Sequence, residues 1–140
     1  MKFSADKVHA QSPAGSEALA VPVYLRANYN QHYLSKVSEL LEVNVESNNS
    51  AVLRGFIARQ SLEYASPFSA PFGGFWRIQG DPCWRDYRSL GERFIAYLVS
   101  RKASVCRLTL PSVCYDPNGM TNQIRGLLSA GFSIDYADIS

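Results

Sequence analysis

One uncharged stretch decides how this chain can fold: Ser66-Pro67-Phe68-Ser69-Ala70-Pro71-Phe72-Gly73-Gly74-Phe75-Trp76. Proline has no N–H to give to a helix or a central strand, and a Gly-Gly pair can adopt positive φ. We therefore predict a loop here, which joins a strand to the helix that follows. Loops in water are usually polar, so the aromatic side chains are expected to fold back on the core, line a ligand groove or lie under a partner.

The composition is that of an ordinary globular domain. The chain has 140 residues, 46% of them hydrophobic and 19% charged, which suits one domain with a single core. Its formal charge of +2 is spread without a basic run, which disfavours nucleic acid as a partner. No apolar stretch approaches the roughly 18 residues of a membrane span, and the start has no signal-peptide pattern. We expect a cytoplasmic protein that does not bind a membrane.

The three cysteines, Cys83, Cys106 and Cys114, form no C-x-x-C pair and leave an odd count. This pattern argues against a disulfide framework and for a reducing compartment. Cys106 and Cys114 are too few to complete a familiar ligand set, so no metal is expected. Cys106 alternates with leucines, which predicts a core thiol rather than a reactive one.

The beginning of the chain predicts an irregular lead-in over residues 1–20 and a short edge strand at 21–25, where Pro22 blocks a central position in a sheet. From Asn28 the pattern changes to that of a helix. Its apolar residues are spaced by four, four and three, the signature of one helical face: Tyr29, Tyr33, Val37 and Leu40.

Three short strands are expected next, at 41–46, 51–59 and 62–65. Turn-forming residues separate them, which predicts an antiparallel meander. Gly55 lies inside the second strand and is expected to mark a bulge or a close approach.

A helix is expected from Asp81-Pro82 to about Lys102, because Asp81 suits the N-cap and Pro82 the first helical position. Four residues at helical spacing predict its buried stripe: Tyr87, Leu90, Phe94 and Leu98. A strand at 105–110 follows and ends at Pro111.

Asp116-Pro117 repeats the same helix start, and Gly131 stands at the expected C′ position. A final strand at 132–139 is joined to the preceding strand by this helix, which normally makes the two parallel. The predicted fold is α+β: an antiparallel meander followed by β-α-β-α-β around a mixed central sheet. We expect one domain over residues 21–140.

The sequence offers no clear catalytic set. His9 and His32 are predicted to be surface or packing residues, since nothing places a nucleophile and an acid beside them. Asp135 and Asp138 would point to opposite faces of a strand, and with Glu63 they are predicted to be solvated. Four tyrosines would suit either an apolar groove or the core: Tyr24, Tyr29, Tyr33 and Tyr64.

Several segments together resemble a known family. These are the stretch from Ser66 to Phe75 followed by a helix, then Leu108-Thr109-Leu110-Pro111, Cys114-Tyr115-Asp116-Pro117 and Leu127-Leu128-Ser129-Ala130-Gly131-Phe132. They resemble bacterial proteins of the GNAT acyltransferase superfamily, and more narrowly the FemX or FemAB-like branch. Those relatives contain two GNAT-like halves, and the resemblance falls on the first. It implies a GNAT-like acyl-CoA N-acyltransferase fold, and acetyl-CoA, acyl-CoA or aminoacyl-tRNA as donors for the full-length family.

In a GNAT domain, the pyrophosphate of acyl-CoA sits between the fourth strand and the following helix, on a Q/R-x-x-G-x-G/A run that exposes backbone N–H groups. The resemblance places Ser66 to Trp76 at that position, where this run is absent. Pro67, Pro71 and Pro82 remove donors, and the Asp81 carboxylate would repel a phosphate. We therefore expect no cofactor on this chain.

The first hypothesis is a GNAT-like domain that is non-catalytic alone and pairs with a second GNAT-like half or with its own copy. In it the loop shapes an acceptor groove or an interface, through Pro67, Phe68, Pro71, Phe72, Gly73, Gly74, Phe75 and Trp76. The second hypothesis is an active N-acyltransferase, with Gly73 and Gly74 as a degenerate phosphate nest and Tyr64 or Tyr115 as the acid. The third is an interaction module without enzymatic activity.

Overall fold

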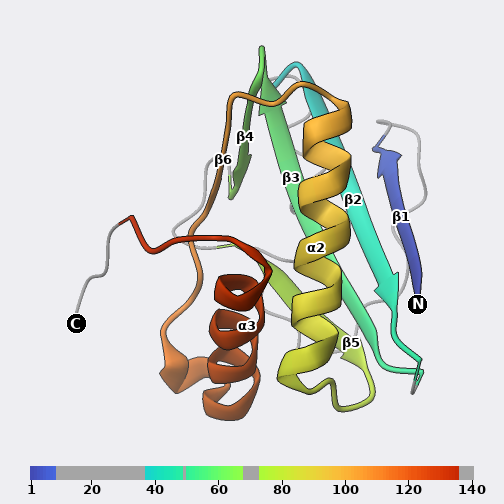
Figure 1. Ribbon diagram of the computed structural model, residues 1–140, viewed down its shortest axis with the longest axis vertical. Coiled ribbons are helices and arrows are strands. Elements are labelled where there is room, and N and C mark those ends of the chain that lie inside the picture. The colour runs from blue at the N-terminus through green and yellow to red at the C-terminus, as the bar shows by residue number, and fades with distance from the viewer. Residues whose placement is uncertain (9–36, 49, 68–72, 136–140) are drawn as a thin grey trace.

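The computed structural model describes residues 1–8, 37–48, 50–67 and 73–135 (Figure 1). Over these residues the chain is α+β, with one mixed sheet of six strands and two α-helices. The elements are β1 (Lys2–Lys7), β2 (Glu39–Glu46), β3 (Val52–Gln60), β4 (Glu63–Ser66), β5 (Phe75–Gln79), α2 (Trp84–Ser100), β6 (Val105–Leu108), the 3-10 turn η3 (Val113–Tyr115) and α3 (Pro117–Ala130). The sheet order is β1-β2-β3-β4-β6, and β5 also pairs with β3.

The predicted antiparallel meander is confirmed. β2 pairs with β3 from Glu39 opposite Arg59 to Glu46 opposite Val52, and β3 continues into β4. Gly55 is a point of close approach, because a Cβ there would lie 2.6 Å from the Phe75 ring. The register shift falls between Val52 and Leu53 instead of at Gly55.

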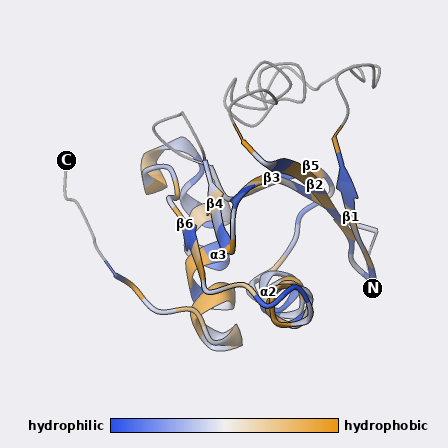
Figure 2. Ribbon diagram, turned by 90° about the horizontal axis from the view of Figure 1, so that it is seen from above, coloured by the Kyte–Doolittle hydropathy of each residue, from blue (hydrophilic) through white to orange (hydrophobic). Residues whose placement is uncertain are grey.

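Both helices lie on one face of the sheet, which we call the inner face (Figure 2). The core sits between this face and α2, where the predicted stripe of Tyr87, Leu90, Phe94 and Leu98 is buried. The ring of Phe94 meets that of Phe75 edge to face, with centroids 5.6 Å apart. Burying such side chains contributes about 2 kcal/mol each, so α2 and the sheet stabilise one another.

The start of the first helix differs from the prediction. Asp81 is not its N-cap: the helix begins at Trp84, and Cys83 occupies the cap. The Cys83 N–H donates to the Asp86 carboxylate at 2.8 Å, which completes a capping box, and the N-cap lies two residues later than predicted. Asp81 instead forms an ion pair with Arg77, 3.4 Å away.

The start of the chain was also predicted wrongly. Residues 2–7, expected to be irregular, form β1 along the open edge of β2. Phe3 and Ala5 alternate with exposed residues and pack against the core, which gives this short segment its strand periodicity.

Two other expected elements change. Leu40 belongs to strand β2, so the helix expected from Asn28 does not extend to it. Residues 132–135 form no strand, and β6 pairs in parallel with β4 instead. The rest of those two segments, and the strand expected at 21–25, lie outside the described residues.

The second helix begins and ends as predicted. The Asp116 side chain accepts a hydrogen bond from the Gly119 N–H at 3.3 Å, and Gly131 ends the helix with φ of 126°. The two helices pack closely because a glycine lies at each contact. A Cβ on Gly91 would lie 2.7 Å from Ala130, and one on Gly126 only 2.5 Å from the Trp84 carbonyl oxygen.

Candidate functional site

The stretch from Ser66 to Trp76 joins two strands, so its expected position between a strand and a helix is wrong. β4 and β5 pair with opposite ends of β3, and the stretch interrupts that edge of the sheet. Phe75 begins a further strand because Gly55, its partner on β3, leaves room for the Phe75 ring. The connection from strand to helix is the segment 80–83.

The described aromatic residues of the stretch are buried. Phe75 has no exposed surface, and Trp76, which is 7% exposed, packs with Met120 of α3. Pro67 is half-buried. Three other residues predicted for a groove or interface lie outside the described part of the chain: Phe68, Pro71 and Phe72.

The two glycines of the stretch already donate their N–H groups within the protein. The Gly73 N–H donates to the Thr109 carbonyl oxygen at 2.6 Å, and the Gly74 N–H donates to Ser66 Oγ at 2.9 Å. Ser66 is 1% exposed and its carbonyl oxygen accepts from the Thr109 N–H at 2.8 Å. Because each N–H group has a partner, neither is available to a phosphate without breaking one of these bonds.

The side chain of Gln123, in α3, lies against the start of strand β5. This side chain is completely buried, and its amide forms two hydrogen bonds with the peptide groups of Phe75. Nε2 donates to the Phe75 carbonyl oxygen at 2.7 Å, and Oε1 accepts from the Phe75 N–H at 3.0 Å. Gln123 therefore satisfies the edge of β5 that faces away from β3.

The sequence pattern does not single out Gln123. Its only signal is position, since it lies three residues after Met120 and four before Leu127, on the apolar face of α3. A glutamine at such a position must find hydrogen-bond partners inside the protein, so it could have been marked as a structural residue.

The segment between β5 and α2 lies beside two carboxylates, and two of its residues, Pro82 and Cys83, offer no free backbone donor. The Cys83 N–H is used by Asp86, and Pro82 has none. Asp81 projects into solvent, with a side chain 94% exposed. Two carboxylates beside a helix start oppose the binding of an anion there.

Several arginine side chains lie close to this helix start. The Trp84 ring lies beside two guanidinium groups, Arg125 at 4.1 Å and Arg85 at 5.0 Å from its centroid. Arg77 is paired with Asp81 at 3.4 Å and with Asp116 at 3.3 Å. The cations in this region are therefore held by the indole ring or by carboxylates.

The two tyrosines considered as acids differ in their surroundings. Tyr64 is 2% exposed in the core, whereas Tyr115 in η3 is 58% exposed. Tyr87 of α2 is also buried, and burial raises its pKa well above the ordinary value, with the Asp116 charge adding to the effect. A buried phenol with a raised pKa stays protonated.

The three cysteines differ in their exposure to solvent. Burial raises the pKa of Cys106 to about 12, in agreement with the predicted core thiol, while Cys83 and Cys114 are exposed. Within the described ranges, no group of three histidine, cysteine or acidic side chains is placed to hold a metal ion. Asp135 is exposed. The remaining candidates lie outside the described residues: His9, His32, Tyr24, Tyr29, Tyr33 and Asp138.

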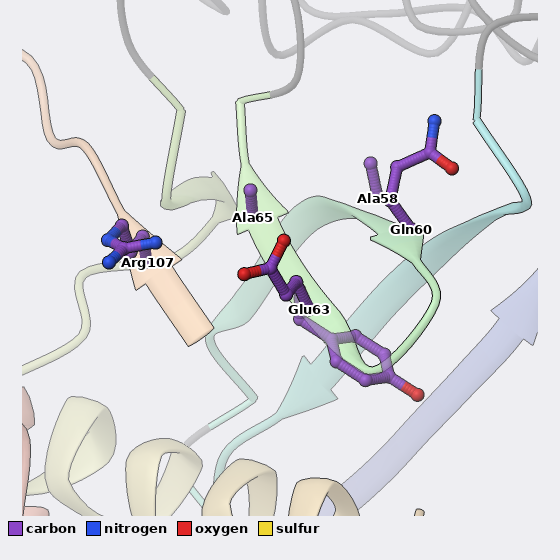
Figure 3. A pocket seen from close by; sticks show the side chains of 6 residues that line it. Ala58, Gln60, Glu63, Ala65 and Arg107 are labelled. Atoms are coloured by element: carbon purple, nitrogen blue, oxygen red, sulfur yellow. The ribbon is translucent and has the colours of Figure 1, made fainter. Parts of the chain in front are cut away.

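A shallow pocket of about 160 Å³ opens on the outer face of the sheet, away from the helices (Figure 3). Ala58 and Ala65 contribute small side chains, and Glu63 and Arg107 place opposite charges at its rim. The other lining residues are Gln60 and Tyr64. Of these, only Glu63 and Tyr64 were considered from the sequence, because a hollow between strands depends on the register.

No helix in the described part of the chain is long and apolar enough to cross a membrane. A scan against models of protein families, a search of the curated proteins and a search of the solved structures each find no match to this chain.

Proposed function

We propose that this chain is a GNAT-like domain of an acyltransferase-related protein, which binds no acyl-CoA itself and contributes an acceptor groove. The order of elements supports the proposal: the three-stranded meander and the short strand β5 are followed by α2, β6 and α3, and β6 is parallel to β4. The segments between Ser66 and Phe132 resemble those of GNAT proteins. This resemblance supports the proposal independently of how the strands pair.

The observation that carries the proposal is the internal use of the backbone donors. A phosphate nest needs several N–H groups that point to one place. Gly73 and Gly74 donate to Thr109 and Ser66, and the Cys83 N–H at the start of α2 donates to Asp86. These bonds disfavour the alternative in which the glycines hold the pyrophosphate of acyl-CoA.

The charges around the helix start point the same way. The pyrophosphate of acyl-CoA is anionic, and in a GNAT-like domain it would lie near the start of this helix, beside the carboxylates of Asp81 and Asp86. Arg77 is nearby, but it is paired with Asp81 and Asp116. Binding would require the phosphates to compete with a carboxylate for that guanidinium group.

The pocket on the outer sheet face supports the acceptor role. It is formed by β3, β4 and β6, next to Ser66 and Pro67, where the interrupted edge begins. An acceptor held there would lie beside this edge of the sheet. A second GNAT-like unit with an acyl donor could then reach it from the same side.

Isothermal titration with acetyl-CoA tests the proposal. We expect no saturable heat from the wild-type chain, and none from Ser66→Ala, which frees the Gly74 N–H but leaves the acidic helix start. A steady-state assay with a panel of amines should show no turnover above a blank without protein. Tight, saturable binding of acetyl-CoA by the wild-type chain would refute the proposal.

A further inference from the structure

The pocket on the outer face is produced by the register of three strands. Ala58 of β3 lies opposite Ala65 of β4, which lies opposite Arg107 of β6. In the next row, Gln60 lies opposite Glu63, and Glu63 opposite Val105. Two neighbouring methyl side chains therefore make the hollow, and longer polar side chains border it (Figure 3).

The two charges at the rim are not paired with each other. Glu63 and Arg107 are exposed, and neither forms an ion pair with another residue in the described part of the chain. A matched pair on the same face behaves differently. Glu42 and Arg54 also lie one diagonal step apart on adjacent strands, and they form an ion pair at 3.1 Å.

The opposite charges suit a small dipolar ligand. Glu63 and Arg107 lie one diagonal step apart on parallel strands, and both side chains are exposed, so each can turn toward a ligand between them. An ammonium and a carboxylate on one carbon lie roughly 3 Å apart, and two charge-assisted hydrogen bonds of about 2.8 Å bring the total span to about 8–9 Å. The pocket volume of about 160 Å³ equals roughly five water molecules in the liquid, which is enough for a few heavy atoms.

We propose that this pocket binds a small zwitterion of the α-amino acid type. Glu63 holds the ammonium group, Arg107 holds the carboxylate, and the ligand side chain rests on Ala65, with the buried Ala58 beneath. The Gln60 amide borders the site, and its Oε1 accepts a hydrogen bond from the Ser38 hydroxyl at 2.9 Å. The assignment rests on the proposed acceptor role and deepens it by naming the chemical class of the acceptor.

Titration of the isotope-labelled full chain with L-alanine, followed by NMR, tests the site. Because both rim charges are exposed, we expect weak binding with a Kd of about 1–10 mM. Shifts should concentrate on the backbone around Ala58, Glu63 and Arg107. Ethylamine and propionate each carry only one of the two charges, so each should bind at least about tenfold more weakly.

Variants assign the contacts. Glu63→Gln and Arg107→Gln should each weaken L-alanine binding about tenfold or more, and Ala65→Leu should abolish it by filling the hollow. Glu92→Gln and Arg93→Gln remove charges from exposed positions of α2 and should leave binding unchanged. Thermal unfolding of every variant establishes that the fold persists.

The results separate this inference from the acceptor-domain proposal. Absence of a saturable shift, equal binding of ethylamine, or unchanged binding by Glu63→Gln would each overturn the amino acid site. None of these outcomes depends on acyl-CoA. Conversely, acetyl-CoA binding by the wild-type chain would refute the proposed function whatever L-alanine does.

Discussion

Replacing Gln123 by methionine should destabilise the domain strongly. Methionine has nearly the same shape and fills the same buried volume, so the substitution leaves no cavity. It removes both hydrogen bonds to Phe75, whose N–H and carbonyl oxygen then lose their partners at 3.0 and 2.7 Å. The structure therefore isolates a polar contribution from a packing contribution at this position.

The expected loss follows from the two groups left unsatisfied. A buried donor or acceptor without a partner costs about 1–3 kcal/mol, which gives about 2–6 kcal/mol for both. The thioether is more apolar than the amide and offsets a part, so we expect about 3 kcal/mol. This is a large share of the about 5–15 kcal/mol by which domains are stable.

Urea unfolding measures the effect. With an m-value of about 2 kcal/mol/M, the midpoint should fall by about 1.5 M at unchanged slope. Gln79→Met, at the exposed end of β5, is the matched control and should leave the midpoint unchanged. Hydrogen exchange of the Phe75 amide should also accelerate in Gln123→Met. If the two variants had the same midpoint and the Phe75 amide stayed protected, the proposed role of Gln123 would be refuted.

Three further predictions concern helix packing, thiol accessibility and ionisation. Gly126→Ala should lower the free energy of unfolding by about 1–3 kcal/mol, because the new Cβ would lie 2.5 Å from the Trp84 carbonyl oxygen. Thermal unfolding measures the effect, and Ser129→Ala on the exposed side of α3 is the control. Equal melting temperatures of the two variants would contradict the close helix contact. In the native chain at pH 8, a thiol reagent should modify Cys83 and Cys114 quickly and Cys106 only after unfolding. The Cys106 thiol has a pKa of about 12 when folded and an ordinary value of 9.0, so its neutral form stabilises the fold at low pH and this contribution is lost as pH rises. Between these values the wild type should lose about 1.4 kcal/mol per pH unit more than Cys106→Ala, and parallel pH profiles would show that the thiol is not buried.

Much of the secondary structure can be predicted from local sequence patterns. The meander follows from strand-forming runs separated by turn residues, and the stripe from Tyr87 to Leu98 follows from helical spacing. Asp116 and Gly131 mark the ends of α3 because capping depends on a few adjacent residues. The position of the α2 N-cap was misjudged since two acids compete there, and the geometry of Asp86 relative to Cys83 decides between them.

Local composition is enough to predict that a loop lies within Ser66 to Trp76, that its aromatic residues need burial, and that it contains no phosphate-binding run. The place of the stretch in the sheet and the hydrogen bonds of its backbone depend on contacts with distant residues. Phe75 enters a strand because Gly55, distant in the chain, leaves space for its ring, and Gln123 of α3 satisfies its peptide groups. The pocket between Glu63 and Arg107 likewise depends on a parallel strand pair. Contacts between residues far apart in the chain leave no local periodicity, so the sequence pattern did not contain them.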